Sequence, residues 1–316
     1  MIDLSVIIPV YRSQDSLQEL YERLVTVFND QGMSFEILFI EDCGDDDSWE
    51  VIQRLAVEDD RVHGFRMSRN YGQHNAILAG IRAATGKLIV TLDDDLQHPP
   101  EELPKLLAKI EEGYDVVYGP PEQEQHGIFR NIASQITKLA LQGAMGAETA
   151  RKVSAFRVFR TELRGAFDKY ESPSVNIDVL LTWATSRFAA LPVRREARKY
   201  GNSGYTTRKL ISHAMNMMTG FSTMPLKLAS LIGFLFALFG VSVLAYVVFR
   251  YLFTGGSVPG FPFLASIIAL FSGAQLLALG IIGEYIARMH QRTMDRPQYH
   301  LRETTKLTKK NGSAER

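Results

Sequence analysis

A single cysteine, Cys43, occurs in the 316-residue chain. An intrachain disulfide needs two cysteines and a cysteine-rich metal site needs several, so the sequence excludes both. Net charge is also absent, because 35 Lys and Arg balance 35 Asp and Glu. A protein that binds nucleic acid through overall basicity carries a positive surplus. We therefore expect a reducing compartment and no nucleic-acid partner.

The balanced total charge conceals three regions of different composition. Residues 1–227 carry 26 basic and 31 acidic side chains, and residues 284–316 carry eight basic and four acidic ones. Between them, residues 228–283 carry only Arg250. The chain therefore combines a segment with the composition of a soluble domain and an apolar one.

Two uncharged runs, 228–249 and 251–283, make up the apolar region. A bilayer core of about 30 Å is crossed by about 20 apolar helical residues, so each run is long enough to span it once. We predict two transmembrane helices, at about 228–251 and 262–286. The alternative is a buried pair of core helices, which in soluble proteins usually shows a polar stripe.

Basic residues flank this pair of predicted spans on its outer sides only, since the connecting segment 252–261 carries no charge. The positive-inside rule then places both termini in the cytoplasm, in a multi-pass protein of the cytoplasmic (inner) membrane. The flanking basic residues are Arg208, Lys209 and Lys227 before the first span, and Arg288, Arg292 and Arg296 after the second.

This division predicts a cytoplasmic domain over 1–204, two transmembrane helices within 228–287 and a basic cytoplasmic tail over 288–316. Apolar residues at helical spacing, interleaved with Arg208 and Lys209, predict an amphipathic juxtamembrane helix within 205–227. An ordinary amphipathic helix that packs on the domain is the open alternative.

Short apolar runs alternate with helical periodicity over the first 120 residues. Runs rich in Ile, Val and Leu on both faces are typical of a parallel sheet covered by helices. We predict an α/β fold with a doubly wound, mostly parallel sheet, in which ligands bind at the carboxyl ends of the strands. The expected strands are 4–9, 35–40, 62–67, 88–92 and 115–118, and the expected helices are 16–30, 48–58, 73–84 and 101–112.

Polar residues follow three of these strands at the edge where ligands are expected. The first strand leads into Tyr11, the second into the acidic run 41–47, and the fourth into 93–100, which reads DDDLQHPP. No phosphate-binding glycine loop follows the first strand, which argues against a P-loop and a dinucleotide-binding Rossmann site. If a nucleotide binds here, a group other than backbone amides has to neutralise its phosphates.

A divalent cation is the candidate for that group. Asp93, Asp95 and Gln97 alternate in sequence, so in an extended strand end their oxygen atoms point the same way and converge on one hard ion. The alternative for these residues is a solvated acidic turn. We interpret Asp45–Asp47 as such a turn, which caps the following helix.

Several segments spread over roughly residues 3–300 carry a family resemblance. They read SVIIPVY, EDCGDDDSW, SRNYGQHNAILAGIRAATGKLIVTLDDDLQHPPEELPKLL, GYDVVYG, FRNIASQ, SAFRVFR and RKYGNSGY. Together these segments resemble inverting glycosyltransferases of the GT-A type, family 2. Within that group the chain is similar to polyprenyl-phosphate glycosyltransferases: dolichyl-phosphate mannose synthases, bactoprenyl glucosyl transferases and undecaprenyl-phosphate aminoarabinose transferases.

The resemblance implies metal-dependent, inverting transfer of a sugar from a nucleotide sugar, expected to be a UDP-sugar, to undecaprenyl phosphate. The product would serve cell-envelope glycan assembly or modification. By the same resemblance, Asp93, Asp95 and Gln97 bind Mg²⁺ or Mn²⁺, and Asp95 and Asp178 are catalytic, with helix capping as the alternative for Asp178. The implied nucleotide-binding residues are Pro9, Tyr11, Asp42, Arg69, Asp93 and Asp94.

Arg130 and Ser134, spaced by one helical turn, match the pair that holds the lipid phosphate in this family. Arg157 and Arg198 match further residues near the diphosphate or the acceptor. For these two arginines, surface charge beside an anionic membrane is the alternative. Relatives with such a hairpin are oligomers, so we expect a homo-oligomer.

The chain departs from the family pattern at Arg12-Ser13, where Asn-Glu is usual, and at Arg151, where Asp is usual. Gly204 stands where a phosphate-binding lysine is usual. Two other functions stay open. A processive polysaccharide synthase carries a QxxRW motif, which neither Trp49 nor Trp183 completes. A non-enzymatic membrane scaffold with a degenerate fold would account for the departures.

Overall fold

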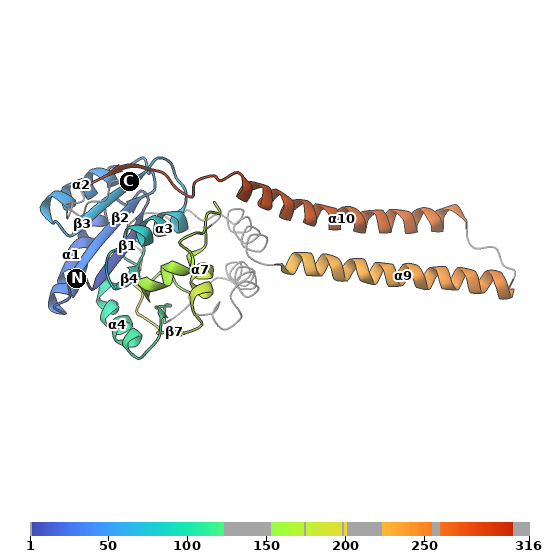
Figure 1. Cartoon of the computed structure of the whole chain (residues 1–316), viewed down its shortest axis with the longest axis horizontal. Coiled ribbons are helices and arrows are strands. Elements are labelled where there is room, and N and C mark those ends of the chain that lie inside the picture. Colours follow the sequence, from blue (N-terminus) through green and yellow to red (C-terminus); the bar gives the residue numbers. More distant parts are fainter. Residues whose placement is uncertain are drawn as a thin grey trace, which may run out of the picture.

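The computed structural model describes residues 2–122, 153–173, 175–197, 199–200, 223–254 and 260–305. Most of the described residues before 200 form one domain around a mixed sheet, from which two long helices project (Figure 1). In sheet order the eight strands are β7 (Phe188–Ala190), β5 (Val116–Tyr118), β6 (Arg157–Arg160), β4 (Leu88–Thr91), β1 (Leu4–Val10), β2 (Phe35–Glu41), β3 (Val62–Met67) and β8 (Leu301–Thr304).

The centre of the sheet is parallel, as predicted. β1 pairs in parallel with both β2 and β4, and β2 pairs in parallel with β3. Every residue of β1 and β2 is buried, as expected for strands covered on both faces. The predicted α/β architecture is therefore confirmed.

Helices cover both faces of this sheet and create two apolar cores. One core joins alternate β1 residues such as Leu4 and Val6 to the helices on one face, and the other core joins Ile7 to the helices on the opposite face. The first face carries α1 (Leu17–Asp30), α2 (Ser48–Glu58) and α4 (Leu103–Glu111), which a single turn, η1 (Pro100–Glu102), precedes. The second carries α3 (Gln73–Ala83), η2 (Thr161–Ala166) and α7 (Ile177–Ala184).

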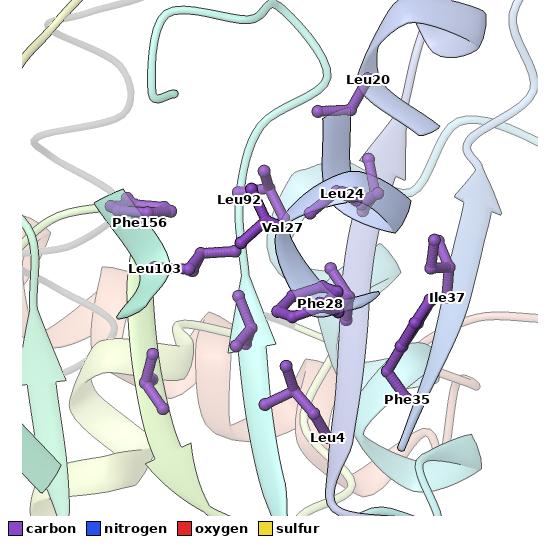
Figure 2. Packing of buried hydrophobic residues seen from close by; sticks show 14 of the residues in the cluster. Leu4, Leu20, Leu24, Val27, Phe28, Phe35, Ile37, Leu92, Leu103 and Phe156 are labelled. Atoms are coloured by element: carbon purple, nitrogen blue, oxygen red, sulfur yellow. The ribbon is translucent and has the colours of Figure 1, made fainter. Parts of the chain in front are cut away.

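Helical periodicity explains how α1 packs. Its buried residues are spaced by three, four, three and one positions, which places them on one side of the helix. Figure 2 shows this side against the strands, with Phe28 next to Phe35, whose ring centroid lies 5.0 Å away. The buried residues of α1 are Leu17, Leu20, Leu24, Val27 and Phe28.

Three strands were not predicted. β6 lies antiparallel between β4 and β5, and β7 extends the sheet beyond β5. β8 comes from the region that we predicted only as a basic tail, 288–316, and pairs antiparallel with β3. Each is only three or four residues long, and β6 and β8 each contain two charged residues, so these two lack the compact apolar run that identified β4 and β5.

The two apolar runs form α9 (Met224–Thr254) and α10 (Phe261–Thr293). Their most apolar stretches, Pro225–Arg250 and Leu270–Thr293, have mean hydropathies of 2.5 and 1.5, and neither contains a residue that the described chain buries fully. The helices lie side by side (Figure 1), with the Phe271 ring 5.5 Å from that of Phe236. Two helices suited to a membrane were predicted, and two are found.

A juxtamembrane helix was predicted within 205–227. Residues 205–222 of that range lie outside the described residues, and the residues from Met224 onward belong to α9.

The segment after α10 returns to the domain and docks on it. The Gln298 side chain is buried and its amide donates hydrogen bonds to the carbonyl oxygens of Tyr170 (2.5 Å) and Ser172 (3.2 Å). β8 follows, and the Trp49 indole donates to a carboxylate oxygen of Glu303 at 3.1 Å. The hairpin is thus tied to the domain at the end of its second helix.

Gly64 of β3 permits this docking. A Cβ atom at this position would lie 2.5 Å from Ile52 of α2 and 3.0 Å from Thr305, so only glycine leaves room for α2 and the residue that follows β8 together.

Candidate functional site

Three loops converge at one edge of the sheet because they follow neighbouring parallel strands. β4, β1 and β2 are adjacent, and their carboxyl ends lie at the same edge. The loop after β1 begins with Tyr11, the loop after β2 with Asp42, and the loop after β4 contains Asp93. This edge is where ligands of open α/β sheets bind.

Asp94 fastens the first of these loops to the third. Its Oδ2 atom accepts hydrogen bonds from the Tyr11 backbone amide at 3.1 Å and from the Ser13 hydroxyl at 2.5 Å. Burial raises the pKa of Asp94 to about 6, against the lowering effect of those two donors. The carboxylate that we predicted to contact the nucleotide is thus one that orders the loop after β1.

Arg12 and Ser13, which depart from the family pattern, have partners in the neighbouring loops after β2 and β4. Arg12 has a positive φ of 57° and forms an ion pair with Asp45 at 2.5 Å, and its guanidinium lies 5.2 Å from the centre of the Tyr11 ring. Ser13 binds Asp94, as described above. The Arg12-Ser13 departure therefore builds contacts between the acidic loops rather than leaving the loop unsupported.

Asp42 holds the loop that leads into α3. Its two carboxylate oxygens accept the backbone amides of Tyr71 and Gly72, each at 2.7 Å. The side chain is 3% exposed; burial raises its pKa, and the two amide donors oppose that effect. In the same loop, the Arg69 guanidinium lies 4.5 Å from the centre of the Tyr71 ring.

Of the remaining nucleotide candidates, Tyr11 is 45% exposed at the site edge, and Pro9 is a buried residue within β1. The exposed Tyr11 ring offers a flat surface on which a base can stack.

The acidic loop after β4 is a turn and not an extended strand end. β4 ends at Thr91, Leu96 has a positive φ of 59°, and Asp95 Oδ1 accepts the Gln97 backbone amide at 3.0 Å. The expectation that residues 93, 95 and 97 share one face of an extended strand is therefore wrong. The reason is local, because an aspartate that bonds the amide two residues later stabilises a turn.

Each of the three predicted cation ligands has a protein partner in this structure. Asp93 Oδ1 accepts the Gln73 side-chain amide at 2.6 Å, and Asp95 Oδ1 accepts the Gln97 backbone amide. Gln97 is 8% exposed, and its Oε1 accepts Nε of Arg195 at 3.0 Å and also Nη2 of the same side chain.

Within the described residues, no group of three or more His, Cys, Asp and Glu side chains is placed to hold a metal. Two carboxylates and an amide on one turn nevertheless match the oxygen ligands that Mg²⁺ and Mn²⁺ prefer. The donor set fits such a cation, on the condition that Arg195 leaves Gln97.

Arg157 and Asp178 form a buried ion pair instead of two separate ligand-facing groups. Arg157 is 1% exposed and Asp178 is 5% exposed, and Nη1 of the arginine donates to Oδ1 of the aspartate. The Tyr118 hydroxyl donates to the same Oδ1 at 3.1 Å, and Arg157 Nε donates to the Thr91 hydroxyl at 2.8 Å. Burial and the charge of Asp178 raise the pKa of Tyr118, so its hydroxyl stays protonated as a donor.

This buried cluster lies directly beneath the acidic loop, because Thr91 is the last residue of β4 and the loop begins two positions later. Asp178, Tyr118 and Asp93 all raise the pKa of Arg157, whereas burial lowers it, and the net direction is upward. Asp178 also lies in the first turn of α7. The N-cap of that helix is Asn176, so Asp178 does not cap it. Arg157 and Asp178 therefore bond to each other and, through Arg157, to Thr91 at the base of the loop.

The predicted acceptor residues Arg130, Ser134 and Arg198 lie outside the described residues.

Of two cavities in the described part of the chain, one borders this edge. One of about 480 Å³ is lined by Asp3, Lys87 and Arg160, near the opposite ends of the strands, and another of about 480 Å³ lies between the starts of α1 and α2. The second cavity borders the loops after β1 and β2, because Gln14 and Asp47 line it.

Sequence reasoning missed two residues that the site brings together, Arg195 and Gln73. Arg195 belongs to the basic segment VRREARKY, and that excess of positive charge is the one signal that pointed to it. Gln73 opens α3, where glutamine gives no distinctive pattern.

Comparison with known proteins agrees with this geometry. The profile described as glycosyl transferase family 2 matches residues 5–169. The chain is 36% identical over 303 residues to an undecaprenyl-phosphate 4-deoxy-4-formamido-L-arabinose transferase of Salmonella typhimurium, which covers 95% of this chain and 93% of that one. The Klebsiella pneumoniae protein of the same name is 37% identical over 301 residues, covering 94% and 92% of the two chains.

Among solved structures, the glucosyl-3-phosphoglycerate synthase of Mycobacterium tuberculosis, crystallised with Mn²⁺ and UDP, aligns with a TM-score of 0.52 and 14% identity. The alignment covers 69% of this chain and 78% of that one, and it supports the fold alone. The family resemblance noted from the sequence motifs is confirmed by the match of a family profile to half of the chain and by relatives that align over nearly all of it. The chain therefore belongs to glycosyl transferase family 2 and is a glycosyltransferase.

Proposed function

We propose that this chain transfers a sugar from a nucleotide sugar, a UDP-sugar, to undecaprenyl phosphate at the cytoplasmic face of the inner membrane, with inversion at the anomeric carbon. The observation that carries the proposal is the combination, in one chain, of an acidic loop at the ligand edge of the sheet and two apolar helices suited to a membrane. Relatives named undecaprenyl-phosphate transferases align over both parts.

Transfer to a lipid phosphate requires the protein to position the two substrates and to offset their negative charge. A lipid phosphate is already anionic near pH 7, so it attacks the anomeric carbon without a strong general base. A bond forms from the phosphate oxygen to that carbon, and the bond from the carbon to the donor diphosphate breaks on the opposite face. Asp93, Asp95 and Gln97 would hold Mg²⁺ or Mn²⁺, which stabilises the negative charge of the departing nucleoside diphosphate.

The described residues support this by holding the loops around the donor. Asp42 orders the loop before α3, Asp94 orders the loop after β1, and the Arg157–Asp178 pair supports the acidic loop from below. Asp178 in this arrangement is a positioning residue, because its carboxylate is buried against Arg157 and Tyr118. Contact with the lipid phosphate remains assigned to Arg130, Ser134 and Arg198 from the family resemblance.

The membrane topology has support from the fold as well as from charge. β8, which follows α10, and β3, which precedes α9, belong to the same sheet. This connection supports a topology in which both ends of the helical hairpin lie on one side of the membrane. The basic residues that flank the hairpin favour the cytoplasm as that side. A prenyl phosphate, whose tail stays in the bilayer, would then meet the domain at the cytoplasmic surface.

The test is transfer of label by membranes that contain the full-length chain, supplied with labelled nucleotide sugars and undecaprenyl phosphate. We expect label in the lipid fraction, its loss with EDTA, and its recovery with Mg²⁺ or Mn²⁺. Asp95→Ala should abolish the transfer while the domain stays folded, and Asp60→Ala, which removes an exposed carboxylate between α2 and β3, should behave as wild type.

Other outcomes contradict the proposal in recognisable ways. Label that accumulates in polymer indicates a polysaccharide synthase. Label that appears in neither fraction with any donor indicates a scaffold. Undiminished transfer by Asp95→Ala refutes the cation site.

A further inference from the structure

The segment after β7 is held alongside the acidic loop from both directions. The Leu191 amide donates to the Tyr118 carbonyl at 2.8 Å, which continues the strand pairing of β5 with β7. The Glu196 amide donates to the Gln97 carbonyl at 2.9 Å, and the Glu196 side chain pairs with Arg23 of α1 at 3.3 Å. Arg195, between these anchors, therefore has a backbone whose position beside Gln97 is fixed.

The Arg195 side chain binds the atom that a cation would need. Two of its N–H groups, on Nε and Nη2, point at the Oε1 atom of Gln97. An amide oxygen has two lone pairs, so these two donors saturate it. The guanidinium also places a positive charge beside the acidic loop, because it is within hydrogen-bond distance of Gln97. A cation and Arg195 therefore compete for Gln97 by ligand occupancy and by charge.

Displacement of Arg195 would not leave it without a partner. The residue is otherwise exposed, and its guanidinium has five N–H donors in a fork that matches phosphate oxygens. A donor diphosphate bound to a cation on residues 93, 95 and 97 would lie within reach of a side chain that begins next to Gln97. The same group that opposes the cation alone would thus favour the cation together with a diphosphate.

We propose that Arg195 is a donor-binding residue that exchanges partners: it holds the Gln97 oxygen until a divalent cation takes that oxygen, and its guanidinium then binds the diphosphate of the nucleotide sugar. The inference rests on the proposed function, because it takes the nucleotide-sugar donor and the cation site from it. Its consequence is a coupling of cation and nucleotide binding, each of which strengthens the other by the same factor. The enzyme then binds the cation mainly as a complex with its donor.

The experiment measures Mn²⁺ binding to the full-length protein in detergent, from the electron paramagnetic resonance signal of free Mn²⁺, with and without UDP. Arg195→Gln removes the guanidinium and keeps a polar side chain. Arg194→Gln is the matched control, because Arg194 is the neighbouring residue with the same charge, is exposed, and pairs with Glu196 at 3.4 Å. Thermal unfolding of both variants verifies that they are folded.

We expect Arg195→Gln to bind Mn²⁺ alone more tightly than wild type, and UDP to enhance its Mn²⁺ binding about tenfold less than it does in wild type, a loss typical of a single coupling interaction. Arg194→Gln should match wild type in both measurements. Equal behaviour of the two variants would overturn the role of Arg195.

The outcomes also separate this inference from the proposed function. If wild type binds Mn²⁺ and UDP together and transfers sugar, and Arg195→Gln equals Arg194→Gln, the role of Arg195 fails alone. If wild type binds no Mn²⁺ with UDP and transfers no label to lipid, the proposed function fails first, and the inference falls with it.

Discussion

Removal of the Asp178 carboxylate tests whether this residue supports the loop or performs chemistry. Asp178→Ala takes away the acceptor of both Arg157 Nη1 and the Tyr118 hydroxyl, and leaves Arg157, at 1% exposure, with the Thr91 hydroxyl as its remaining hydrogen-bond acceptor among those described. Breaking a buried ion pair by removing one partner costs about 3–5 kcal/mol, because the other charge stays buried. For a domain of this size, that corresponds to a fall in Tm of roughly 10 °C.

Replacing the whole cluster should restore most of that loss. A triple variant, Arg157→Met with Asp178→Leu and Tyr118→Phe, leaves neither a buried charge nor an orphaned hydroxyl, and apolar replacement of buried ion pairs is often neutral or stabilising. We expect its Tm to lie much closer to wild type than that of Asp178→Ala. The control is Asp168→Ala, which removes an exposed carboxylate and should change stability by less than about 0.5 kcal/mol.

The assay is thermal unfolding of the full-length chain in detergent, followed by circular dichroism, beside transfer to undecaprenyl phosphate in the same preparations. The reasoning is refuted if Asp178→Ala unfolds at the wild-type temperature and yet loses all transfer, because that result would make Asp178 a chemical participant and not a support.

Three further predictions follow from buried contacts. Gly80→Ala should destabilise the domain by about 1–3 kcal/mol, because its Cβ would lie 2.4 Å from Ile7 Cγ2, whereas Gly165→Ala, with open space around it, should not; equal Tm values for the two would contradict the packing. A chain that ends at residue 296 loses β8 and the Gln298 contacts. Because several hydrogen bonds are lost, its Tm should fall by roughly 5–10 °C. A chain that ends at residue 305 should keep most of its stability. Burial raises the pKa of Asp94 from 3.8 to about 6, so between about pH 4 and 6 the folded chain keeps a proton that the unfolded chain releases, and the contribution of this group to stability falls as the pH rises through that window. Asp94→Asn, measured by denaturant titration in EDTA, should remove that decline; an unchanged pH profile would show that Asp94 does not titrate there.

Much of the fold could be predicted because its signals are local. The strands of the parallel centre were expected within one residue of the observed ends, since each is a compact apolar run between helical patterns. The two apolar helices were expected from length and the absence of charge, and they extend a few residues beyond the predicted spans at most ends. In the same way, the order of the strands predicted that Tyr11, Asp42 and Asp93 follow strand ends at one edge.

The structural features that sequence reasoning missed depend on contacts between residues far apart in the chain. β6 and β8 are four-residue strands whose existence depends on the neighbours they pair with, and β8 lies more than 200 residues from β3. The acidic loop was expected to be extended because its alternating pattern suits a strand, and the bond from Asp95 to the Gln97 amide turns it instead.

Sequence by itself determined the chemistry available to this protein: an acidic loop after a buried strand, a set of arginines, and two helices too apolar for water. Tertiary structure alone decided how those groups are used. Arg157 and Asp178, 21 residues apart, neutralise each other in the core, and Arg195, 98 residues from Gln97, occupies the oxygen expected for a cation. The physical reason is that apolar periodicity is a property of residues close together in the sequence. The partner of a buried or partly buried charge, in contrast, is the opposite charge or lone pair that the folded chain brings within about 3 Å of it.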